Sequence, residues 1–474
     1  MPRAPSQETL AELKAAVGEA GWLDTSADLC AYTVDFRRLY RGATPLVLMP
    51  RETAQVAHIL SICSRDEIAV VPQGGNTSYC GGATPDESGT QVVISMRRLN
   101  RVRRVDPGDY SMVAEAGCTL AEVHAAAHSA ERLFPLSIGS QGTAQIGGNL
   151  STNAGGTAVL RYGMMRDLVL GLEVVLADGR VLQGLKSLRK DNTGYDVKSW
   201  FIGAEGTLGV ITAACLKLFP RPADTATALI GLDTPRRALD LLSHLRAAAG
   251  DELTAFELMP RIAVELTVRH IPGVANPLDQ GAPWYALVEL SAPNPGARVS
   301  GVLTDALQEA AERSLLMDAS IATSLSQAAA MWKLRESVPE AQRHHGGSLK
   351  HDVSVPISRI PELIERGSEL VHRLVPEGDV VSYGHLGDGN LHFNVSQRPG
   401  TSTPAFLARA APLETEVFDL VESLGGSISA EHGIGRLKAG ELAARADPVE
   451  LSAMHALKAA LDPKGILNPG KVLR

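Results

Sequence analysis

Two histidines flank a strong turn signal in the segment GHLGDGNLHFN, residues 384–394. The flanking residues are rich in strand formers, and the Asp-Gly dipeptide between the histidines favours a two-residue β-hairpin turn. In that hairpin His385 faces His392 on the neighbouring strand, with Cβ atoms about 4.5–5.5 Å apart. Asn394, two residues beyond His392, points to the same side of its strand. Two imidazoles this close can share a metal ion at about 2.0–2.1 Å.

A carboxylate that could complete such a metal site occurs in the segment SAEHGIGR, residues 429–436. Two histidines and one carboxylate leave coordination positions open for a substrate, which is typical of a catalytic site. Adjacent residues of an extended chain point to opposite sides, so His432 can serve as a general base while Glu431 binds the ion. Two alternatives stay open: His432 is the third ligand and Glu431 orients it, or the hairpin is purely structural.

The elements that must position these residues fall into two parts. Residues 45–222 alternate short apolar runs with glycine-rich turns and a few helical patterns, which predicts an α+β nucleotide-binding domain. It is not a Rossmann unit, because no GxGxxG opens a helix after a first strand. From about residue 225 strands and helices form a ferredoxin-like pattern, followed by a long polar helix that begins near Ser324. The N-terminus predicts an amphipathic helix capped by Ser6.

Three glycine-rich segments in the first part suggest one large ligand. They are VPQGGNTS at 71–78, the polar stretch at 139–163, and FIGAEGTLGVIT at 201–212. Small residues let backbone N–H groups converge on an anion, and hydroxyl groups add donors. No lysine follows the first glycines, so the segment is not a P-loop. A dinucleotide is the ligand that this combination favours.

Six ordered motifs resemble the FAD-dependent D-2-hydroxyacid dehydrogenase branch of the vanillyl-alcohol-oxidase superfamily. The resemblance spans about residues 30–474, over PQGGNTS, GGNLSTNAGG with RYG, DNTGYDVKSWFIGAEGTLGVIT, GHLGDGNLHFNV, SAEHGIGRLK and DPKGILNPGK. That branch includes D-lactate, D-2-hydroxyglutarate and glycolate dehydrogenases.

The resemblance implies an α+β fold in three parts. Residues 1–222 would form a two-subdomain FAD-binding domain of the para-cresol methylhydroxylase (PCMH) type, with its core at about 41–222. Residues 223–435 would form a ferredoxin-like α+β substrate (cap) domain with the metal site. Residues 436–474 would form a helical segment that returns to the FAD domain.

The cofactor implied is FAD, held without a covalent bond. Relatives with covalently attached flavin often carry a histidine in the first glycine-rich loop, where this chain has Gln73; attachment at Cys80 is an alternative. The resemblance implies four groups of residues along the cofactor. These are Pro72, Gly74, Gly75, Asn76 and Thr77 at the pyrophosphate; Gly142, Gly148, Asn149, Asn153 and Gly156 further along; Glu205, Gly206 and Ile211 near the adenine or ribose end; and Asn468 near the isoalloxazine.

The resemblance also assigns the metal and substrate residues. It implies His385, His392 and Glu431 as ligands of a divalent ion, with zinc expected and manganese or cobalt also compatible. His432 would be the general base. The expected substrate contacts are Arg335 in LRES, Lys350 in SLKHDV, and Asn394. One departure weakens a dicarboxylate assignment: relatives acting on D-2-hydroxyglutarate tend to carry threonine where this chain has Pro339.

Charge, cysteine content and the N-terminal residues limit the partners and the cellular location that we expect. The net charge of −8 and pI of about 5.9 argue against nucleic acid as a partner. The five scattered cysteines spell neither a disulfide framework nor an iron–sulfur site. The N-terminus lacks the features of a signal or transit peptide, and no apolar run is long enough to span a membrane. These observations predict a cytoplasmic protein, or one peripheral to the inner membrane.

The reaction these features favour is oxidation of a D-2-hydroxy acid, with D-2-hydroxyglutarate or D-lactate as best candidates. The metal would lower the pKa of the substrate hydroxyl, His432 would take the proton, and hydride would pass to flavin N5. Electrons would leave to an external acceptor, an electron-transfer flavoprotein or a quinone, and a homodimer is a further expectation. The alternatives are an FAD-using alkyl-transferring synthase, a flavin-free metal hydrolase, and a catalytic subunit that works within a larger glycolate-oxidising complex.

Overall fold

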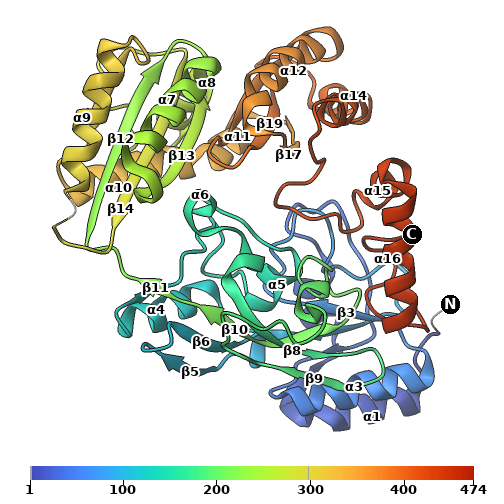
Figure 1. Ribbon diagram of the computed structural model, residues 1–474. Coiled ribbons are helices and arrows are strands. Elements are labelled where there is room, and N and C mark those ends of the chain that lie inside the picture. The colour runs from blue at the N-terminus through green and yellow to red at the C-terminus, as the bar shows by residue number, and fades with distance from the viewer. Residues whose placement is uncertain (1–2, 297) are drawn as a thin grey trace. The chain divides into compact units, whose positions relative to one another are not determined.

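The computed structural model describes residues 3–296 and 298–474, which form two compact units (Figure 1). Unit 1 comprises Met1–Gly155, Met164–Arg221 and His432–Arg474. Unit 2 comprises Gly156–Gly163 and Pro222–Glu431. The short excursion at Gly156–Gly163 places these residues with unit 2, although the sequence pattern assigned them to the FAD-binding part.

The sheets of unit 1 have different strand directions. In the order β1-β2-β4-β3, strands β2, β4 and β3 run parallel and β1 is antiparallel. The order β5-β6-β10-β8-β9 is antiparallel throughout. The strands are β1 (Trp22–Leu23), β2 (Val47–Leu48), β3 (Val70–Gln73), β4 (Val92–Ser95), β5 (Val102–Asp106), β6 (Ser111–Glu115), β7 (Arg132–Leu133), β8 (Val169–Val175), β9 (Val181–Gly184), β10 (Val210–Lys217) and β11 (Phe219–Pro220).

Helices of unit 1 pack on these sheets through apolar faces. Leu13 and Val17 of α1 join Ile59 and Leu60 of α3 in one core cluster with the parallel strands. The predicted cap of the first helix is confirmed, because the Ser6 hydroxyl accepts a hydrogen bond from the Thr9 amide. The helices are α1 (Gln7–Val17), α2 (Ser26–Thr33), α3 (Thr53–Asp66), α4 (Leu120–Ser129), α5 (Ile146–Ser151), α15 (Ala439–Arg445) and α16 (Pro448–Leu461).

The C-terminal segment returns to the sheet with the order β1-β2-β4-β3. The Val70 amide of β3 donates to the Ile466 carbonyl, and the Asn468 amide donates to the Val70 carbonyl, each at 2.8 Å. Ile466 and Leu467 are fully buried in the same core as β3. The residues after α16 are therefore an integral part of unit 1.

Unit 2 is built on one long antiparallel sheet. Its order is β15-β12-β14-β13-β18-β19-β16, and β17 also pairs with β19. Its strands are β12 (Asp224–Leu232), β13 (Leu253–Pro260), β14 (Trp284–Ala292), β15 (Asp318–Ile321), β16 (Ser348–Leu349), β17 (Asp352–Ser354), β18 (Gly378–His385) and β19 (Asn390–Gln397).

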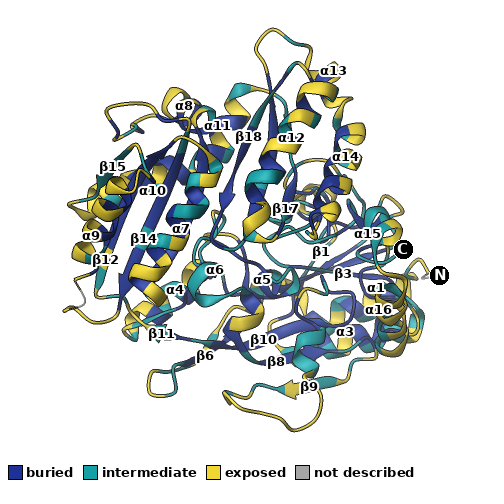
Figure 2. Cartoon of the chain, turned by 45° about the horizontal axis from the view of Figure 1, so that its top comes forward, coloured by how far each residue is buried: buried dark blue, intermediate teal, exposed yellow. Residues whose placement is uncertain are grey.

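Helices cover both faces of this sheet. One core cluster joins alternate strand residues with α7, α9, α12 and α14, and a second joins the other strand residues with α8, α10 and α11. In Figure 2 the strands are largely buried while the outer surfaces of the helices are exposed. The helices are α6 (Val159–Tyr162), α7 (Pro235–Ala249), α8 (Arg261–His270), α9 (Val299–Glu312), α10 (Leu325–Glu336), α11 (Val338–His345), α12 (Ile360–Leu374), α13 (Thr403–Leu407) and α14 (Ala410–Ser423).

The prediction of one long helix after Ser324 is wrong in one respect. Ser324 does cap a helix, α10, but that helix ends at Glu336 and α11 begins after Ser337. Pro339 explains the break, because it has no N–H to give to an interior helical hydrogen bond. At the start of a new helix that N–H would have had no partner anyway. Among the described residues, no helix is both long and apolar enough to span a bilayer.

Candidate active site

The histidine hairpin has a register different from the predicted one. Tyr383 of β18, not His385, lies opposite His392 of β19. The reason is the turn: it occupies residues 386–389, and the amides of Asp388 and Gly389 both donate to the His385 carbonyl. The Asp-Gly pair thus forms the second half of a longer turn. A two-residue change keeps side chains on the same face. The rings of His385 and His392 accordingly lie 5.8 Å apart between centroids.

A buried chain of charged groups fixes His385. Its Nδ1 lies 2.6 Å from Oε1 of Glu257 on β13, and Oε2 of Glu257 accepts from Nε and Nη2 of Arg335, each at 2.7 Å. Burial alone would raise the pKa of Glu257, but Arg335 and His385 outweigh it and lower that pKa to about 2. Burial opposes protonation of His385, yet Glu257 raises its pKa to about 9. Glu257 therefore holds the ring so that Nε2 points away from it.

Glu431 lies between the two histidines. Its Oε1 is 3.6 Å from Nε2 of His385, and its Oε2 is 3.8 Å from Nε2 of His392. These distances exceed those of hydrogen bonds. They match two ligand atoms that each lie about 2 Å from a common ion. Burial raises the pKa of Glu431 to about 7, and its acidic neighbours Asp352 and Asp388 add to that effect.

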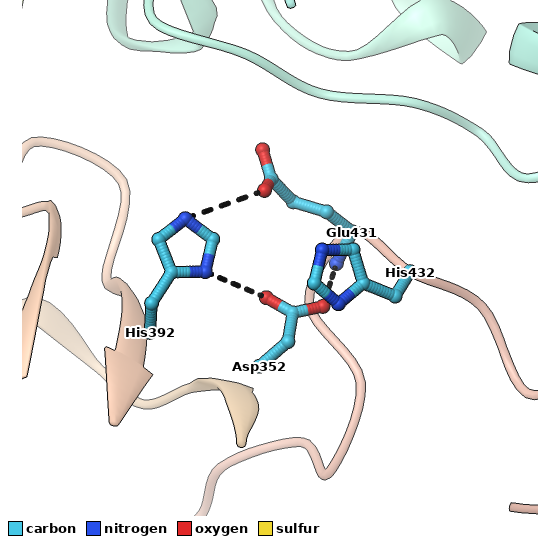
Figure 3. A group of neighbouring side chains, drawn as sticks. All are labelled: Asp352, His392, Glu431 and His432. Carbon is cyan, nitrogen blue, oxygen red and sulfur yellow. Dashed lines mark hydrogen bonds and ion pairs between the residues drawn. The ribbon is translucent and has the colours of Figure 1, made fainter. Parts of the chain in front are cut away.

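Asp352 supports the second histidine and the segment of Glu431 (Figure 3). Its Oδ1 lies 3.7 Å from Nδ1 of His392, and its Oδ2 accepts a 2.8 Å hydrogen bond from the Glu431 amide. Ligand atoms of Asp352, His392, Glu431 and the following residue, His432, all lie within 4.8 Å of one another. Each histidine thus has a carboxylate near Nδ1 and Glu431 near Nε2, an arrangement typical of metal-binding histidines.

Sequence reasoning missed Glu257 and Asp352. Asp352 lies opposite His392 in the pairing of β17 with β19, and Glu257 lies opposite His385 in the pairing of β13 with β18. For Glu257 the available signal was an acidic residue within the apolar run LTAFELMP, which needs a partner when it is buried, whereas Asp352 lies in the polar run SLKHDVS and gives no such signal. That signal does not say which histidine, if any, provides the partner.

The three predicted substrate residues, Asn394, Lys350 and Arg335, all belong to unit 2. Asn394 is buried, and its Nδ2 donates to Oε1 of Gln342 on α11 at 3.0 Å. Lys350 lies between β16 and β17, two residues before Asp352. Arg335 is tied to the histidine pair through Glu257. The structure therefore brings His385, Glu431 and their supports together, and attaches Arg335 to them through one carboxylate.

Four buried side-chain atoms of unit 1 have no hydrogen-bond partner among the described residues, and one of them is Oγ1 of Thr84. The other three suit a polar cofactor: Oε1 of Gln145, Nδ2 of Asn149 and Oδ1 of Asn468. A buried polar atom without a hydrogen bond is costly unless a ligand or water supplies one. Asn149 and Asn468 were predicted as cofactor residues, whereas Gln145 was missed. A lone glutamine beside a glycine-rich stretch gives no specific signal.

The glycines of the predicted FAD loops play different parts. A Cβ added to Gly142 or Gly148 would meet nothing within 4 Å, so a ligand could approach the backbone there. A Cβ on Gly75 would lie 1.9 Å from the Thr143 carbonyl oxygen, which makes that glycine a packing requirement. The side chains of Asn76 and Asn153 are both used internally: Asn76 donates to the Val34 carbonyl, and Asn153 accepts from the Arg166 amide. These two can serve a cofactor through their backbone.

The roles of the other predicted cofactor residues stay a prediction, and the structure gives only their places in the fold. Thr77 follows β3, and Pro72 lies within it beside Gly206; Ile211 is buried in β10. Gly156 belongs to unit 2. The Cys80 thiol is buried and lies 3.3 Å from the Gly433 carbonyl oxygen, to which it donates.

The expected separation of Glu205 and Asn468 along the cofactor is wrong. Nδ2 of Asn468 donates to the Glu205 carbonyl at 2.8 Å, so the two residues cannot flank opposite ends of an extended dinucleotide. The Glu205 carboxylate accepts hydrogen bonds from the amides of Ile434 and Gly435 at 2.7–3.1 Å. Burial raises the pKa of Glu205. Its side chain therefore holds the segment after His432 and is not available to a ribose.

Two protein-family models match the chain, one in its N-terminal part and one in its C-terminal part. A model described as "FAD linked oxidases, C-terminal domain" matches residues 221–472, and one described as "FAD binding domain" matches residues 44–184. The chain belongs to this family of FAD-linked oxidases. The matched regions contain the first two glycine-rich segments and the histidine site described above, and the third segment, residues 201–212, lies between the two matches.

Curated relatives show to which group of enzymes within this family the chain belongs. D-2-hydroxyglutarate dehydrogenase from Bos taurus is 42% identical over 93% of this chain and 79% of its own length. The enzyme of the same name from Arabidopsis thaliana is 37% identical over 97% of this chain and 80% of its own length. A D-2-hydroxyglutarate–pyruvate transhydrogenase from Saccharomyces cerevisiae is 35% identical over 94% and 90%. Within the family, the chain belongs to the FAD-dependent D-2-hydroxyacid dehydrogenases.

Solved structures confirm the fold. p-Cresol methylhydroxylase covers the whole chain with a TM-score of 0.77 at 17% identity. Alkyldihydroxyacetonephosphate synthase covers 99% of the chain with a TM-score of 0.75 at 18% identity. At these identities the likeness shows the fold alone, which is the predicted PCMH-type α+β fold.

The prediction of a cytoplasmic location is wrong. The relatives from Bos taurus, Rattus norvegicus, Oryza sativa and Arabidopsis thaliana are named mitochondrial. The prediction relied on the composition of the N-terminal residues, and composition alone does not define the compartment in which an enzyme works.

Proposed function

We propose that this chain oxidises a D-2-hydroxy acid to the 2-oxo acid with FAD and one divalent metal ion. The observation that carries the proposal is the position of Glu431 between Nε2 of His385 and Nε2 of His392. Family membership supplies the flavin half of the proposal, and the polar atoms of Gln145, Asn149 and Asn468 fit a bound polar cofactor.

His385, His392 and Glu431 are the proposed ligands. Asp352 is the competing third ligand, but both of its oxygens are already used: Oδ2 by the Glu431 amide and Oδ1 by Nδ2 of Asn390 at 2.9 Å. We assign Asp352 to orienting His392, as Glu257 orients His385. Zinc is the proposed ion, and the ligand set also suits manganese or cobalt. When bound, such an ion makes a coordinated hydroxyl group more acidic.

His432 is the proposed general base. Its ligand atom lies within 4.8 Å of that of Glu431, so its imidazole would lie near a hydroxyl group coordinated by the ion that Glu431 is proposed to hold. An imidazole changes charge near neutral pH, which suits removal of a proton from an acidified alcohol. The glycine-rich loops of unit 1 would hold and orient FAD, which would supply a hydride acceptor for the substrate Cα.

Arg335, Lys350 and Asn394 are the proposed substrate contacts. A guanidinium carries five N–H donors, and Glu257 takes donors on two nitrogens of Arg335, so donors remain for a carboxylate. Relatives named for D-2-hydroxyglutarate favour a dicarboxylate substrate. Pro339 removes one hydroxyl contact from that pattern, and D-lactate is therefore the second candidate.

The electron acceptor is proposed to be external to the chain. An electron-transfer flavoprotein or a quinone are the expected acceptors, and the name of the yeast transhydrogenase adds a small 2-oxo acid to the candidates. The expected homodimer stays a prediction that size-exclusion chromatography with light scattering would check.

Removing the charge of Arg335 should destabilise unit 2. In Arg335→Met, Glu257 stays buried without its main cation, which is expected to lower the free energy of unfolding by about 3–5 kcal/mol. The matched control is Arg366→Met, because the Arg366–Glu362 pair is exposed and such pairs contribute about 0–1 kcal/mol. Urea unfolding followed by circular dichroism measures both. Equal stabilities of the two variants would contradict the structural role of the Arg335–Glu257 pair.

Affinity for the divalent ion should rise with pH. Metal ligands bind as unprotonated groups, so ions and protons compete. Without an ion the pKa of His385 is about 9 and that of Glu431 about 7, and protons must leave both groups. The apparent Kd of Co²⁺ for chelator-treated protein should therefore fall as the pH is raised over that range. An absorbance titration at several pH values measures it, and an affinity that is flat or declines with pH would contradict the ligand assignment.

A dye-reduction screen tests the proposed function. The substrates are D- and L-lactate, glycolate, malate, and D- and L-2-hydroxyglutarate, each with and without a chelator. Activity on a D-isomer that chelation removes and Zn²⁺, Mn²⁺ or Co²⁺ restores is the expected result. Activity on L-isomers only, or none affected by chelation, would overturn it. A purified protein without flavin colour would favour the metal-hydrolase alternative, and activity only in a larger assembly would favour the glycolate-oxidising complex.

A further inference from the structure

An aromatic ring of unit 1 covers the side chain of His432. The ring of Tyr79 stacks on the imidazole with centroids 4.4 Å apart and planes inclined by 16°. Both residues belong to unit 1, and Tyr79 follows the first glycine-rich loop directly. Phe36 packs against Tyr79 in turn, with centroids 5.6 Å apart. The imidazole is therefore the end of a short series of rings.

The backbone after His432 is fixed independently of this stack. The Cys80 carbonyl accepts from the amides of Arg436 and Leu437, and the Cys80 thiol donates to the Gly433 carbonyl. The Glu205 carboxylate accepts from the two amides between these contacts. These bonds set the position of the backbone, while the two side-chain torsions of His432 depend on what its imidazole contacts. A ring parallel to the imidazole restricts the plane in which it lies.

We infer that Tyr79 is a positioning residue for His432: its ring holds the imidazole in the orientation in which it removes the substrate proton. The inference rests on the proposed role of His432 as the general base. A general base acts only when its nitrogen is within hydrogen-bond reach of the proton. A displacement of a reacting group by about 1 Å can lower the rate by about a hundred-fold. Tyr79 thus links the flavin-binding loop of unit 1 to the proton transfer.

Anaerobic stopped-flow reduction of the flavin by the best substrate of the screen tests this. Tyr79→Leu is expected to lower the limiting reduction rate by about ten-fold, with the substrate concentration for half-maximal rate within about two-fold of wild type. Tyr79→Phe keeps the ring and should stay within about two-fold of wild type in both. Tyr195→Leu is the matched control, because Tyr195 is 87% exposed in the same unit, and it should change neither.

A double-mutant cycle separates positioning from a general structural effect. In the His432→Gln background, Tyr79→Leu should cause no further loss, because Tyr79 acts through the imidazole. Dithionite reduction of the bound FAD checks that the cofactor is in place in every variant. If Tyr79→Leu does not retain FAD, Tyr79→Met, which fills similar volume without a planar ring, replaces it and should show the same ten-fold loss.

The inference and the proposed function fail differently. If His432→Gln reduces its flavin as fast as wild type, the proposed base is wrong and the inference falls with it. If His432→Gln is slow but Tyr79→Leu reduces flavin at the wild-type rate, the inference alone is overturned. A ten-fold loss that Tyr79→Leu also adds on top of His432→Gln would likewise overturn it, since the effect would not pass through the imidazole.

Discussion

His385→Ala is expected to lose metal-dependent turnover, with kcat/KM lowered by about a thousand-fold or more. The loss follows from removing one of the three proposed ligands, because charge stabilisation by a bound ion contributes several kcal/mol and each 1.36 kcal/mol is a factor of ten. Steady-state dye reduction measures the rate. Elemental analysis of the purified protein measures the ion, which should fall well below one equivalent while FAD content stays unchanged.

The matched control for this variant is His344→Ala. His344 lies on α11 of the same unit, its side chain is 58% exposed, and no proposed role depends on it. This variant should keep both its ion and its activity. A His385→Ala protein that keeps wild-type kcat/KM, or that loses activity while its ion content is unchanged, would contradict the assignment of His385 as a ligand.

His432→Gln is expected to slow flavin reduction by about 10²–10⁴-fold, the usual contribution of a general base. Glutamine keeps a polar side chain of similar length but cannot take the proton. Single-turnover reduction under anaerobic conditions measures the effect without interference from the electron acceptor. Ion and FAD content should match wild type, because neither is proposed to bind through this imidazole.

The same variant decides between the two roles left open by the sequence. If His432 is a metal ligand, the ion content of His432→Gln falls together with its activity. The position of His432 in a group of ligand atoms within 4.8 Å of one another makes this outcome a real alternative. Loss of rate with full ion content supports the base, and loss of both contradicts it.

The sequence predicts the fold and the face of the hairpin but not its register. Period-two alternation defines which side chains share a face, and His385 and His392 do share one. The register depends on how many residues form the turn, and pairing with β13 extends β18 as far as His385. Since Glu257 lies more than 120 residues earlier in the chain, no local pattern could show that it fixes this strand end.

The sequence also could not show which carboxylates contact the two histidines of the site. Glu257 and Asp352 act through contacts with residues distant in the chain, and a buried acid in a strand has many suitable partners. Asn468 and Glu205 were predicted as separate cofactor positions, but their direct contact depends on where the C-terminal segment meets the loop after Phe201. Motifs therefore suggest candidate residues, while the distances between motifs required the folded chain.

Anaerobic flavin reduction by D-2-hydroxyglutarate decides whether oxidation of the D-acid needs the divalent ion as well as the flavin. The holoenzyme is mixed with the D- or L-isomer before and after chelation, and with the ion restored. The expected result is fast bleaching of the flavin band by the D-isomer, near-complete loss after chelation, and recovery when Zn²⁺, Mn²⁺ or Co²⁺ is returned. D-lactate is run in parallel as the second candidate. Reduction by either D-acid at an unchanged rate in the chelated, ion-free enzyme would contradict this need for the ion.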